Sequence, residues 1–338
     1  MRKPHNKSQN RQKPSRQNPA RAVEKGRERS RQPDSRPEKR SEKRPDNRQD
    51  HRPDHRQDHR PAKSRLSVMP DQVMIYGRHP AAAALANPAR KIRAIYVTED
   101  AQSWIQADHG AALARRNLTP IVVDRADMAD ALPPQDKHVH QGVVIVALPL
   151  SPPSLDEWLD DWLDNRLDNR LDDNQNDGQA AKQTVLVMLD QITDGRNIGA
   201  IMRSALAFGA HAIITTDRNT PTETGAMLRA ASGAAEHMPL IRVVNLSRAI
   251  TLLQDHHFIV AGLDARGTAD LTGCANEDRL VLVLGAEGSG LRHLTREKVD
   301  QLIRIPMSDH AESLNVSNAA AVALYAATAG QFKNAKND

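Results

Sequence analysis

The chain is poor in cysteine and has no long apolar run. A single cysteine, Cys274, among 338 residues excludes a disulfide framework and a thiolate metal site. We interpret it as a small apolar filler and not as a nucleophile. No apolar run approaches the ~20 residues that span a membrane, and no apolar segment near the start is typical of a signal peptide. We therefore expect a cytoplasmic protein.

Apolar side chains are scarcest in residues 1–65, which lack Ile, Phe, Tyr and Trp. This segment holds 22 Lys or Arg and 9 Asp or Glu, a net charge of +13, whereas residues 66–338 hold 25 and 33, a net charge of −8. With so little to bury, residues 1–72 are expected to form a disordered basic tail. Such a tail most often contacts nucleic acid, and the alternative is a solubilising segment without a partner.

Apolar runs alternate with helical patterns in two regions, which predicts an α/β fold. In residues 73–150 we expect strands at 73–77, 94–97, 121–123 and 142–148 and helices at 78–87 and 103–116, a small α/β domain. In residues 184–338 we expect strands at 185–189, 212–215, 240–243, 258–263, 280–285 and 302–306, with helices between them and a last one at 318–332. These later strands are apolar throughout, which indicates a parallel sheet covered by helices on both faces.

Residues 151–183 lie between the two regions and read as an acidic, Asn/Asp-rich linker. Its first part has apolar residues at helical spacing, namely Leu155, Trp158, Leu159, Trp162 and Leu163. The rest is expected to be mobile. We favour a tethering connector over a docking helix.

Three polar segments each begin where an apolar run stops. They are DQITDGRNIGAIMRSA (190–205), GAEGSG (285–290) and IPMSDHAESLNVS (305–317). In open α/β sheets, ligands bind beyond the carboxyl ends of the strands, so we expect these segments to form one site. They supply Asn197, Arg203, Glu287, Ser313 and Asn315 but no Cys/His cluster, so the predicted chemistry is polar and metal-free.

The GAEGSG turn does not suit a dinucleotide. Its glycines have the spacing G-x-x-G-x-G instead of G-x-G-x-x-G, and Glu287 stands where a pyrophosphate needs backbone N–H groups. S-adenosylmethionine is a sulfonium without phosphates, so it tolerates the carboxylate. The glycines would let the backbone approach its adenosine.

Two features of the loops leave alternatives open. Ser313 and Asn315 precede the last helix, where they either cap it or belong to the site, and we favour a mixed role. Arg203 either forms a structural ion pair with Glu287 or Asp190, or contacts a phosphate or hydroxyl group in the site.

Taken together, the three segments resemble the motifs of the SpoU/TrmH group of the SPOUT RNA 2′-O-methyltransferases. DQITDGRNIGAIMRSA, VLGAEGSGL and IPMSDHAESLNVSNAAAVALY match in order and spacing. VMIYGRHP, HQGVV and ASGAAEHMPLIRV agree further. The resemblance covers 73–150 and 184–333 and leaves the basic tail and residues 160–182 outside it.

The resemblance implies a ribosomal-protein-like α/β/α substrate-RNA-binding domain at 73–150 and a methyltransferase domain with a deep trefoil knot at 184–338. It implies homodimers and S-adenosylmethionine as the cofactor. The implied cofactor contacts are Gly285, Glu287, Gly288, Ile305, Met307 and Leu314. The implied catalytic positions are Asn197, Arg203, Glu287, Ser313 and Asn315, with the counterpart of Arg203 proposed as the base.

The function that the resemblance implies is methyl transfer to the ribose 2′-hydroxyl of a guanosine in 23S rRNA. A tRNA ribose 2′-O-methyltransferase of the same group is one alternative, and a non-catalytic RNA-binding ribosome-assembly factor is another. A nicotinamide enzyme is disfavoured by the glycine spacing.

Overall fold

The computed structural model describes residues 66, 68–172, 183–218, 220–308, 310–311 and 313–333. These residues belong to one compact unit, Arg60–Asp338. The tail expected over residues 1–72 lies almost wholly outside the described residues, as does the stretch 173–182 of the segment expected to be mobile.

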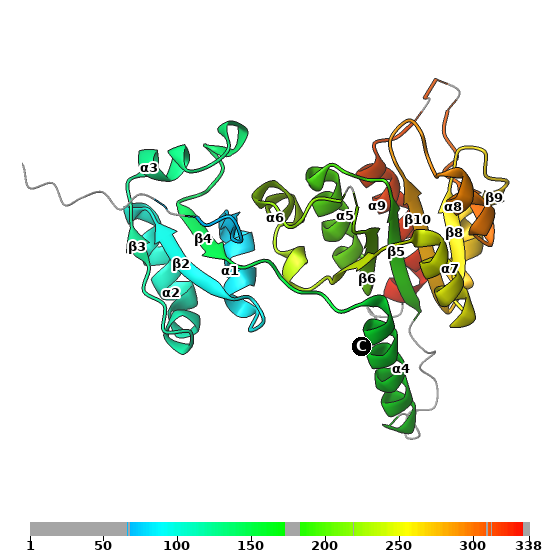
Figure 1. Cartoon of the computed structure of the whole chain (residues 1–338), viewed down its shortest axis with the longest axis horizontal. Coiled ribbons are helices and arrows are strands. Elements are labelled where there is room, and N and C mark those ends of the chain that lie inside the picture. The colour runs from blue at the N-terminus through cyan, green and yellow to red at the C-terminus, as the bar shows by residue number, and fades with distance from the viewer. Residues whose placement is uncertain are drawn as a thin grey trace, which may run out of the picture. The chain divides into compact units, whose positions relative to one another are not determined.

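A four-stranded sheet with the order β1-β4-β2-β3 is built from residues 73–147 (Figure 1). Its strands are β1 (Val73–Tyr76), β2 (Ile92–Val97), β3 (Ile121–Val122) and β4 (Val143–Ala147). Strand β4 is antiparallel to both β1 and β2, whereas β2 and β3 are parallel. The helices of this region are α1 (Arg78–Ala86), α2 (Glu99–Arg115), the short α3 (Arg125–Asp130) and the 3-10 turn η1 (Pro134–Asp136).

Alternate residues of β4 enter two different cores, which places helices on both faces of this sheet. Ile145 packs with apolar residues of α1 and α2, and Val144 packs with Met128 of α3. The small α/β domain expected from the sequence is therefore confirmed as an α/β/α arrangement. Helix α3 was not expected, because its six residues are too few to show a helical period.

The second sheet is parallel throughout and has seven strands in the order β7-β6-β5-β10-β8-β11-β9. The strands are β5 (Thr184–Asp190), β6 (Ala212–Thr216), β7 (Leu240–Val243), β8 (Ile259–Leu263), β9 (Ala269–Asp270), β10 (Arg279–Gly285) and β11 (Gln301–Arg304). The helices are α4 (Leu155–Asp172), α5 (Gly195–Ala207), α6 (Gly225–Ala231), α7 (Leu246–Asp255), α8 (His293–Lys298) and α9 (Val316–Lys333), with 3-10 turns η3 (Ala234–Glu236) and η4 (Leu271–Asn276). The parallel sheet is confirmed, and the trefoil knot stays a prediction.

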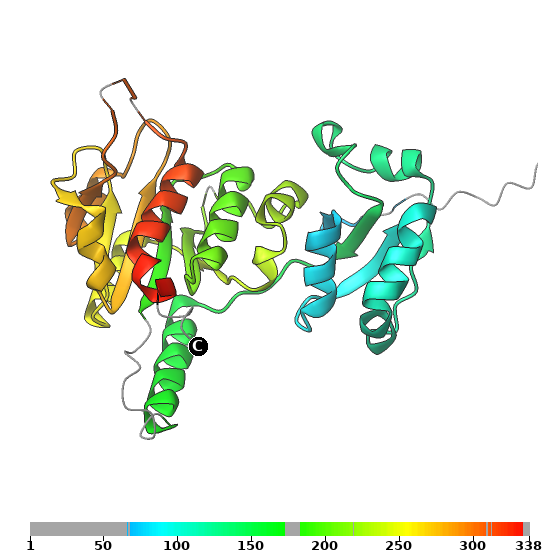
Figure 2. The same ribbon diagram turned by 180° about the vertical axis from the view of Figure 1, so that it is seen from behind.

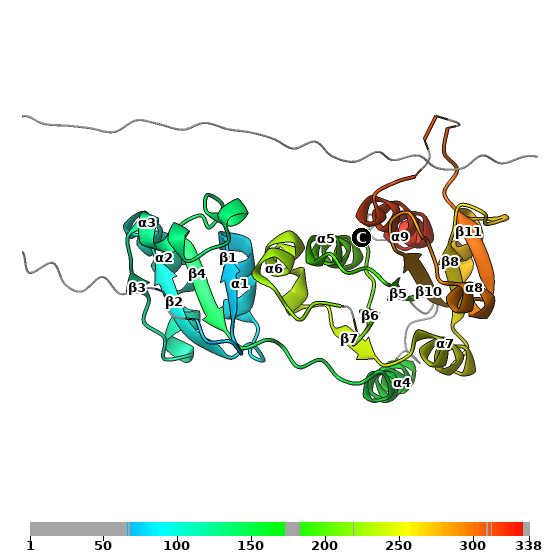
Figure 3. The same ribbon diagram turned by 45° about the horizontal axis from the view of Figure 1, so that its top comes forward.

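Both faces of this sheet are covered, as the uninterrupted apolar strands predicted. Val185 and Val187 of β5 point into the core formed with α5, α6 and α9, whereas Leu186 and Met188 point into the core formed with α4 and α7. Figure 2 shows α9, in red, lying across one face beside α5. Figure 3 shows α4 and α7 below the same sheet.

Helix α4 corrects the expectation of a tethering connector. Leu155, Leu159 and Trp162 are buried in the second core, where the Trp162 ring lies 5.2 Å from that of Phe258. The guanidinium of Arg279 lies 5.0 Å from the centre of the Trp162 ring. Residues 155–163 therefore form a docked helix that covers the sheet, because an apolar stripe at helical spacing is more stable buried than in water.

A buried ion-pair cluster links the first region to the second. Arg90, whose side chain is fully buried, lies 2.6 Å from Glu223 and 2.7 Å from Glu236. The Nδ2 group of Asn87 also donates to Glu236, at 2.8 Å. Burial raises the pKa of Glu223, and the hydrogen bond and charge of Arg90 oppose that rise. The charge of Arg90 therefore offsets part of the cost of burying the Glu223 carboxylate.

Candidate active site

Four loops leave the second sheet at the same edge. Asp190, the last residue of β5, stands beside Gly285, the last residue of β10, in the parallel register. Strand β8 ends at Leu263, which stands beside Ile303 near the end of β11. The three polar segments of the sequence and a fourth one after Leu263 thus start together at the carboxyl edge, as the rule for open sheets predicts.

Glu287 joins three of these loops through one carboxylate oxygen. Its Oε1 accepts a hydrogen bond from Nδ2 of Asn315 at 2.6 Å and from Nδ2 of Asn197 at 3.3 Å. The backbone N–H of Val316 donates to the same atom at 3.4 Å. Asn315 Nδ2 also reaches Oδ1 of Asn197 at 3.3 Å. Three predicted site residues, 118 positions apart at the extremes, therefore form one network.

Asn315 caps α9 and also binds Glu287, while its part in the active site stays a prediction. Its Oδ1 accepts from the backbone N–H of Ser317 at 2.9 Å, which caps α9, while its amide nitrogen binds Glu287. Ser313 is exposed and lines the cavity described below. Capping therefore accounts for part of the role of Asn315.

Asp190 and Arg292 form the ion pair that supports the loop after β10. Asp190 is fully buried, and its carboxylate accepts from Nε of Arg292 at 2.6 Å and from the backbone N–H of Arg292 at 2.9 Å. The ion pair of Arg203 with Asp190 or Glu287 considered from the sequence is therefore wrong. Arg203 is exposed on α5 and has no hydrogen bond or ion pair with another residue that the structure describes.

A cavity of about 500 Å³ opens among these loops. Five predicted site residues line it, namely Gly285, Glu287, Gly288, Ser313 and Leu314. Asn197 and Asn315 are not among the lining residues and are joined to the cavity through Glu287. Ile305, which packs partly buried against the core, and the exposed Met307 are also outside the lining.

The fourth loop supplies lining residues that the sequence analysis missed. Asp264 and Arg266, just after β8, line the cavity together with Leu263 and Ala265. Hydrogen bonds from the Arg266 side chain, with a further one from Arg296, lower the pKa of Asp264 to about 2, although its burial opposes this shift. The sequence could have indicated this loop, because FIVAGL is an apolar run that is also followed by polar residues, like the runs before the other three segments.

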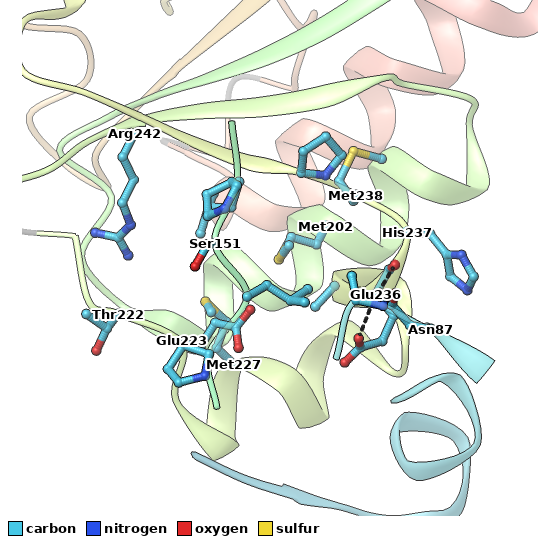
Figure 4. Close-up of a pocket in the computed structure, with 17 residues that line it drawn as sticks. Asn87, Ser151, Met202, Thr222, Glu223, Met227, Glu236, His237, Met238 and Arg242 are labelled. Atoms are coloured by element: carbon cyan, nitrogen blue, oxygen red, sulfur yellow. Dashed lines mark hydrogen bonds between the residues drawn. The ribbon is translucent and has the colours of Figure 1, made fainter. Parts of the chain in front are cut away.

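A second cavity, of about 310 Å³, lies elsewhere (Figure 4). Met202, Met227 and Met238 line it together with Glu223 and Glu236 of the buried cluster. None of the candidate catalytic or cofactor-binding residues lines it. The second cavity is therefore separate from the candidate site at the carboxyl edge of the sheet.

Cys274 behaves as the apolar filler expected from the sequence. It is buried, and its burial raises the pKa of the thiol to about 11, with a further contribution from Glu277. A thiol with this pKa is protonated at neutral pH and is a poor nucleophile.

Across the described part of the chain, no three His, Cys, Asp or Glu side chains are grouped to hold a metal ion. The same residues include no helix that is both long and apolar enough to span a membrane.

Two family models match the chain. The model of the SpoU rRNA Methylase family matches residues 184–325, and the model for RNA 2′-O ribose methyltransferase substrate binding matches residues 74–153. A relative from Haemophilus ducreyi, named as the 23S rRNA (guanosine-2′-O-)-methyltransferase RlmB, is 34% identical over 252 residues, which cover 74% of this chain and 95% of that protein. The chain belongs to the SpoU rRNA methylase family.

One further relative and two solved structures also match the chain. An RlmB protein from a Burkholderia species is 42% identical over 151 residues, which cover 45% of this chain and 61% of that protein. The crystal structure of the SpoU methyltransferase AviRb from Streptomyces viridochromogenes with AdoMet has a TM-score of 0.59 at 21% identity, covering 78% of this chain and 91% of that one. An AdoMet-bound rRNA methyltransferase from Sinorhizobium meliloti also gives a TM-score of 0.59 at 21% identity, with coverages of 77% and 88%. These two structures show the SpoU fold.

A substitution at Gly285 tests how closely the loop after β10 is packed. A Cβ atom at this position would overlap the backbone of Gly290 and Leu291. We expect Gly285→Ala to lower the free energy of unfolding by about 1–3 kcal/mol, because the loop must shift to admit the methyl group. Chemical denaturation measures the loss. Gly273→Ala is the control, because a methyl group there would meet nothing within 4 Å and the φ of Gly273 is not positive; equal losses in the two variants would contradict the packing argument.

Proposed function

We propose that this protein transfers a methyl group from S-adenosylmethionine to the ribose 2′-hydroxyl of a guanosine in 23S rRNA. The observation that carries the proposal is the 34% identity to the RlmB protein over 95% of that protein's length. A substrate in ribosomal RNA implies action in the cytoplasm.

The residues of the cavity suit S-adenosylmethionine. A volume of about 500 Å³ is within the range of small-molecule sites. Glu287 supplies a carboxylate toward a cationic sulfonium, and Gly285 and Gly288 expose backbone where a side chain would fill space. When bound, the cofactor supplies an electrophilic methyl group that needs no metal to activate it.

The chain's own contribution is chiefly positioning. In the reaction, the ribose oxygen forms a bond to the methyl carbon as the carbon–sulfur bond breaks, and the hydroxyl proton is lost. We propose that the network of Asn197, Glu287 and Asn315 holds the loops after β5, β10 and β11, here called the cofactor loops, in one arrangement. Ser313 and Leu314 are proposed to complete the cofactor surface. Holding two reactants in line yields effective molarities of about 10⁵–10⁸ M in favourable cases.

Arg203 is proposed to act on the ribose hydroxyl. A guanidinium group keeps its charge in proteins, so removal of a proton by Arg203 is chemically awkward. We propose instead that it stabilises the developing alkoxide as a cation, while water or a phosphate oxygen takes the proton. Its exposure and its lack of a described partner leave its donors available to RNA.

We also propose that the protein works as a homodimer. The large apolar residues Leu206 of α5 and Val322 and Tyr325 of α9 are exposed, and the Tyr325 ring lies 5.8 Å from that of Phe208. A second copy of the chain would cover these side chains. Light scattering should give twice the chain mass, and Tyr325→Glu should halve it. A monomeric mass for the unaltered protein would contradict this proposal.

The choice between rRNA and tRNA is tested by comparing the two as substrates. With labelled S-adenosylmethionine, kcat/KM should be higher for a 23S rRNA transcript than for unmodified tRNA. Equal or higher values on tRNA would overturn the proposed substrate while leaving methyl transfer intact. Binding of both RNAs without any methyl transfer would favour an assembly factor.

Deletion of residues 1–65 should weaken RNA binding and leave cofactor binding unchanged. The segment carries a net charge of +13, while the rest of the chain carries −8. Each phosphate that is no longer neutralised should reduce the slope of log Kd against log salt by roughly 0.7–0.9. Titrations of both proteins at several salt concentrations measure this. An unchanged affinity and slope would make the tail a solubilising segment.

A further inference from the structure

Arg266 lines the cavity on the loop that follows β8, and its partner Asp264 holds it in place. Arg266 Nε and Nη2 donate to the two carboxylate oxygens of Asp264 at 2.9 and 3.0 Å. The Arg266 backbone N–H also donates to Asp264, at 2.9 Å. Asp264 receives a further hydrogen bond from Nε of Arg296 at 3.1 Å. The guanidinium of Arg266 is therefore fixed before any ligand arrives.

The donors of Arg266 are only partly used. Its side chain is 66% exposed, whereas that of Asp264 is 4% exposed and that of Arg296 is 25% exposed. Nη1 of Arg266 has no partner among the described residues. A guanidinium carries five N–H donors, and the Asp264 side chain takes up two of them. The remaining donors can bind a second acceptor of planar shape.

The charges around the cavity indicate what that acceptor is. Asp264, Arg266 and Arg296 together carry one net positive charge, which a single carboxylate would neutralise. Of these three, Asp264 and Arg266 line the cavity, while Arg296 binds Asp264 from outside the lining. The remaining charged lining residue is Glu287, whose carboxylate binds Asn197 and Asn315. S-adenosylmethionine has cationic groups at its sulfonium and amine and one carboxylate. A ligand of this charge pattern matches the cavity.

We propose that Arg266, pre-positioned by Asp264, binds the carboxylate at the amino-acid end of the cofactor. This inference rests on the proposed function. A phosphate of the RNA is the other anion available to an exposed arginine. The close pairing with Asp264 favours the carboxylate, because it restricts the reach of the side chain and offsets the long-range attraction to a polyanion.

The test compares ligands that differ in the carboxylate. The dissociation constants of the full-length protein are measured by calorimetry for S-adenosylmethionine and for decarboxylated S-adenosylmethionine, which lacks only that group. Arg266→Gln should weaken binding of the first by about 10- to 100-fold, the usual value of a charge-assisted hydrogen bond, and leave binding of the second unchanged.

Arg296→Gln is the matched control, because Arg296 also binds Asp264 but does not line the cavity. It should change the affinity for the two ligands by the same factor. Equal weakening of both ligands by Arg266→Gln, or no weakening, overturns the inference and leaves the proposed function standing. Loss of RNA affinity with unchanged cofactor affinity assigns Arg266 to a phosphate and also overturns it. Failure of the unaltered protein to bind S-adenosylmethionine overturns both.

Discussion

Arg203→Ala should reduce methyl transfer by at least about 100-fold while changing the dissociation constant of the cofactor by less than about twofold. Arg203 does not line the cavity and has no described partner, so its removal leaves the cofactor loops in place. The positive charge of Arg203 is proposed to act only when negative charge develops on the ribose oxygen, and not when the cofactor binds. Single-turnover rates and calorimetry separate the two quantities.

Two further variants sharpen the Arg203 prediction. Arg203→Lys should recover little activity, because lysine keeps the charge but loses the planar set of donors. Arg248→Ala removes an exposed arginine from α7, on the other face of the sheet, and should have near-normal activity. Cofactor affinity that falls in parallel with activity in Arg203→Ala would give Arg203 a structural role instead.

Arg90→Leu should lower the free energy of unfolding by about 3–5 kcal/mol, the usual result of removing one partner from a buried ion pair. It leaves the carboxylates of Glu223 and Glu236 without the cation that now lies within 2.7 Å of each. Arg125→Leu is the control, because Arg125 and Asp100 form an ion pair whose side chains are 61% and 60% exposed. Exposed pairs contribute about 0–1 kcal/mol.

The loss in the free energy of unfolding caused by Arg90→Leu should depend on pH, and its direction follows from the pKa of Glu223. Burial already raises the folded-state pKa of Glu223, and loss of Arg90 raises it further. A carboxyl group with a raised folded pKa destabilises the fold above that pKa, and the penalty is relieved as the pH falls through it. The difference from the unaltered protein should therefore shrink on acidification. A deficit below about 1 kcal/mol, or one that grows with acid, would contradict the account of this cluster.

The sheet could be predicted from the sequence because its signal is local. Each apolar run from 185 to 306 became a strand, and only the two-residue β9 is too short to recognise. The docked position of α4 could not be predicted, because helical spacing shows an apolar stripe but not the surface that covers it. Trp162 meets Phe258, which lies 96 positions away.

Part of the candidate site could likewise be predicted from the sequence, and part could not. The rule that ligands bind at the carboxyl edge brought Asn197, Glu287 and Asn315 together before the structure was known. The pairing of Asp190 with Arg292 spans 102 positions and follows from the register of β5 with β10, which no local pattern encodes. For that reason the sequence suggested Arg203 as a partner of Asp190. Asp264 and Arg266 were missed although their loop also follows an apolar run, because the sequence analysis considered only the three segments after β5, β10 and β11.

The central claim is tested most directly by identifying the methylated nucleoside. A 23S rRNA transcript is incubated with the full-length protein and labelled S-adenosylmethionine in EDTA, digested to nucleosides and separated by mass spectrometry. We expect the label in 2′-O-methylguanosine at a single position, with undiminished yield in the chelator. Label in a methylated base, in another nucleoside, or only when a divalent metal is restored would contradict the account.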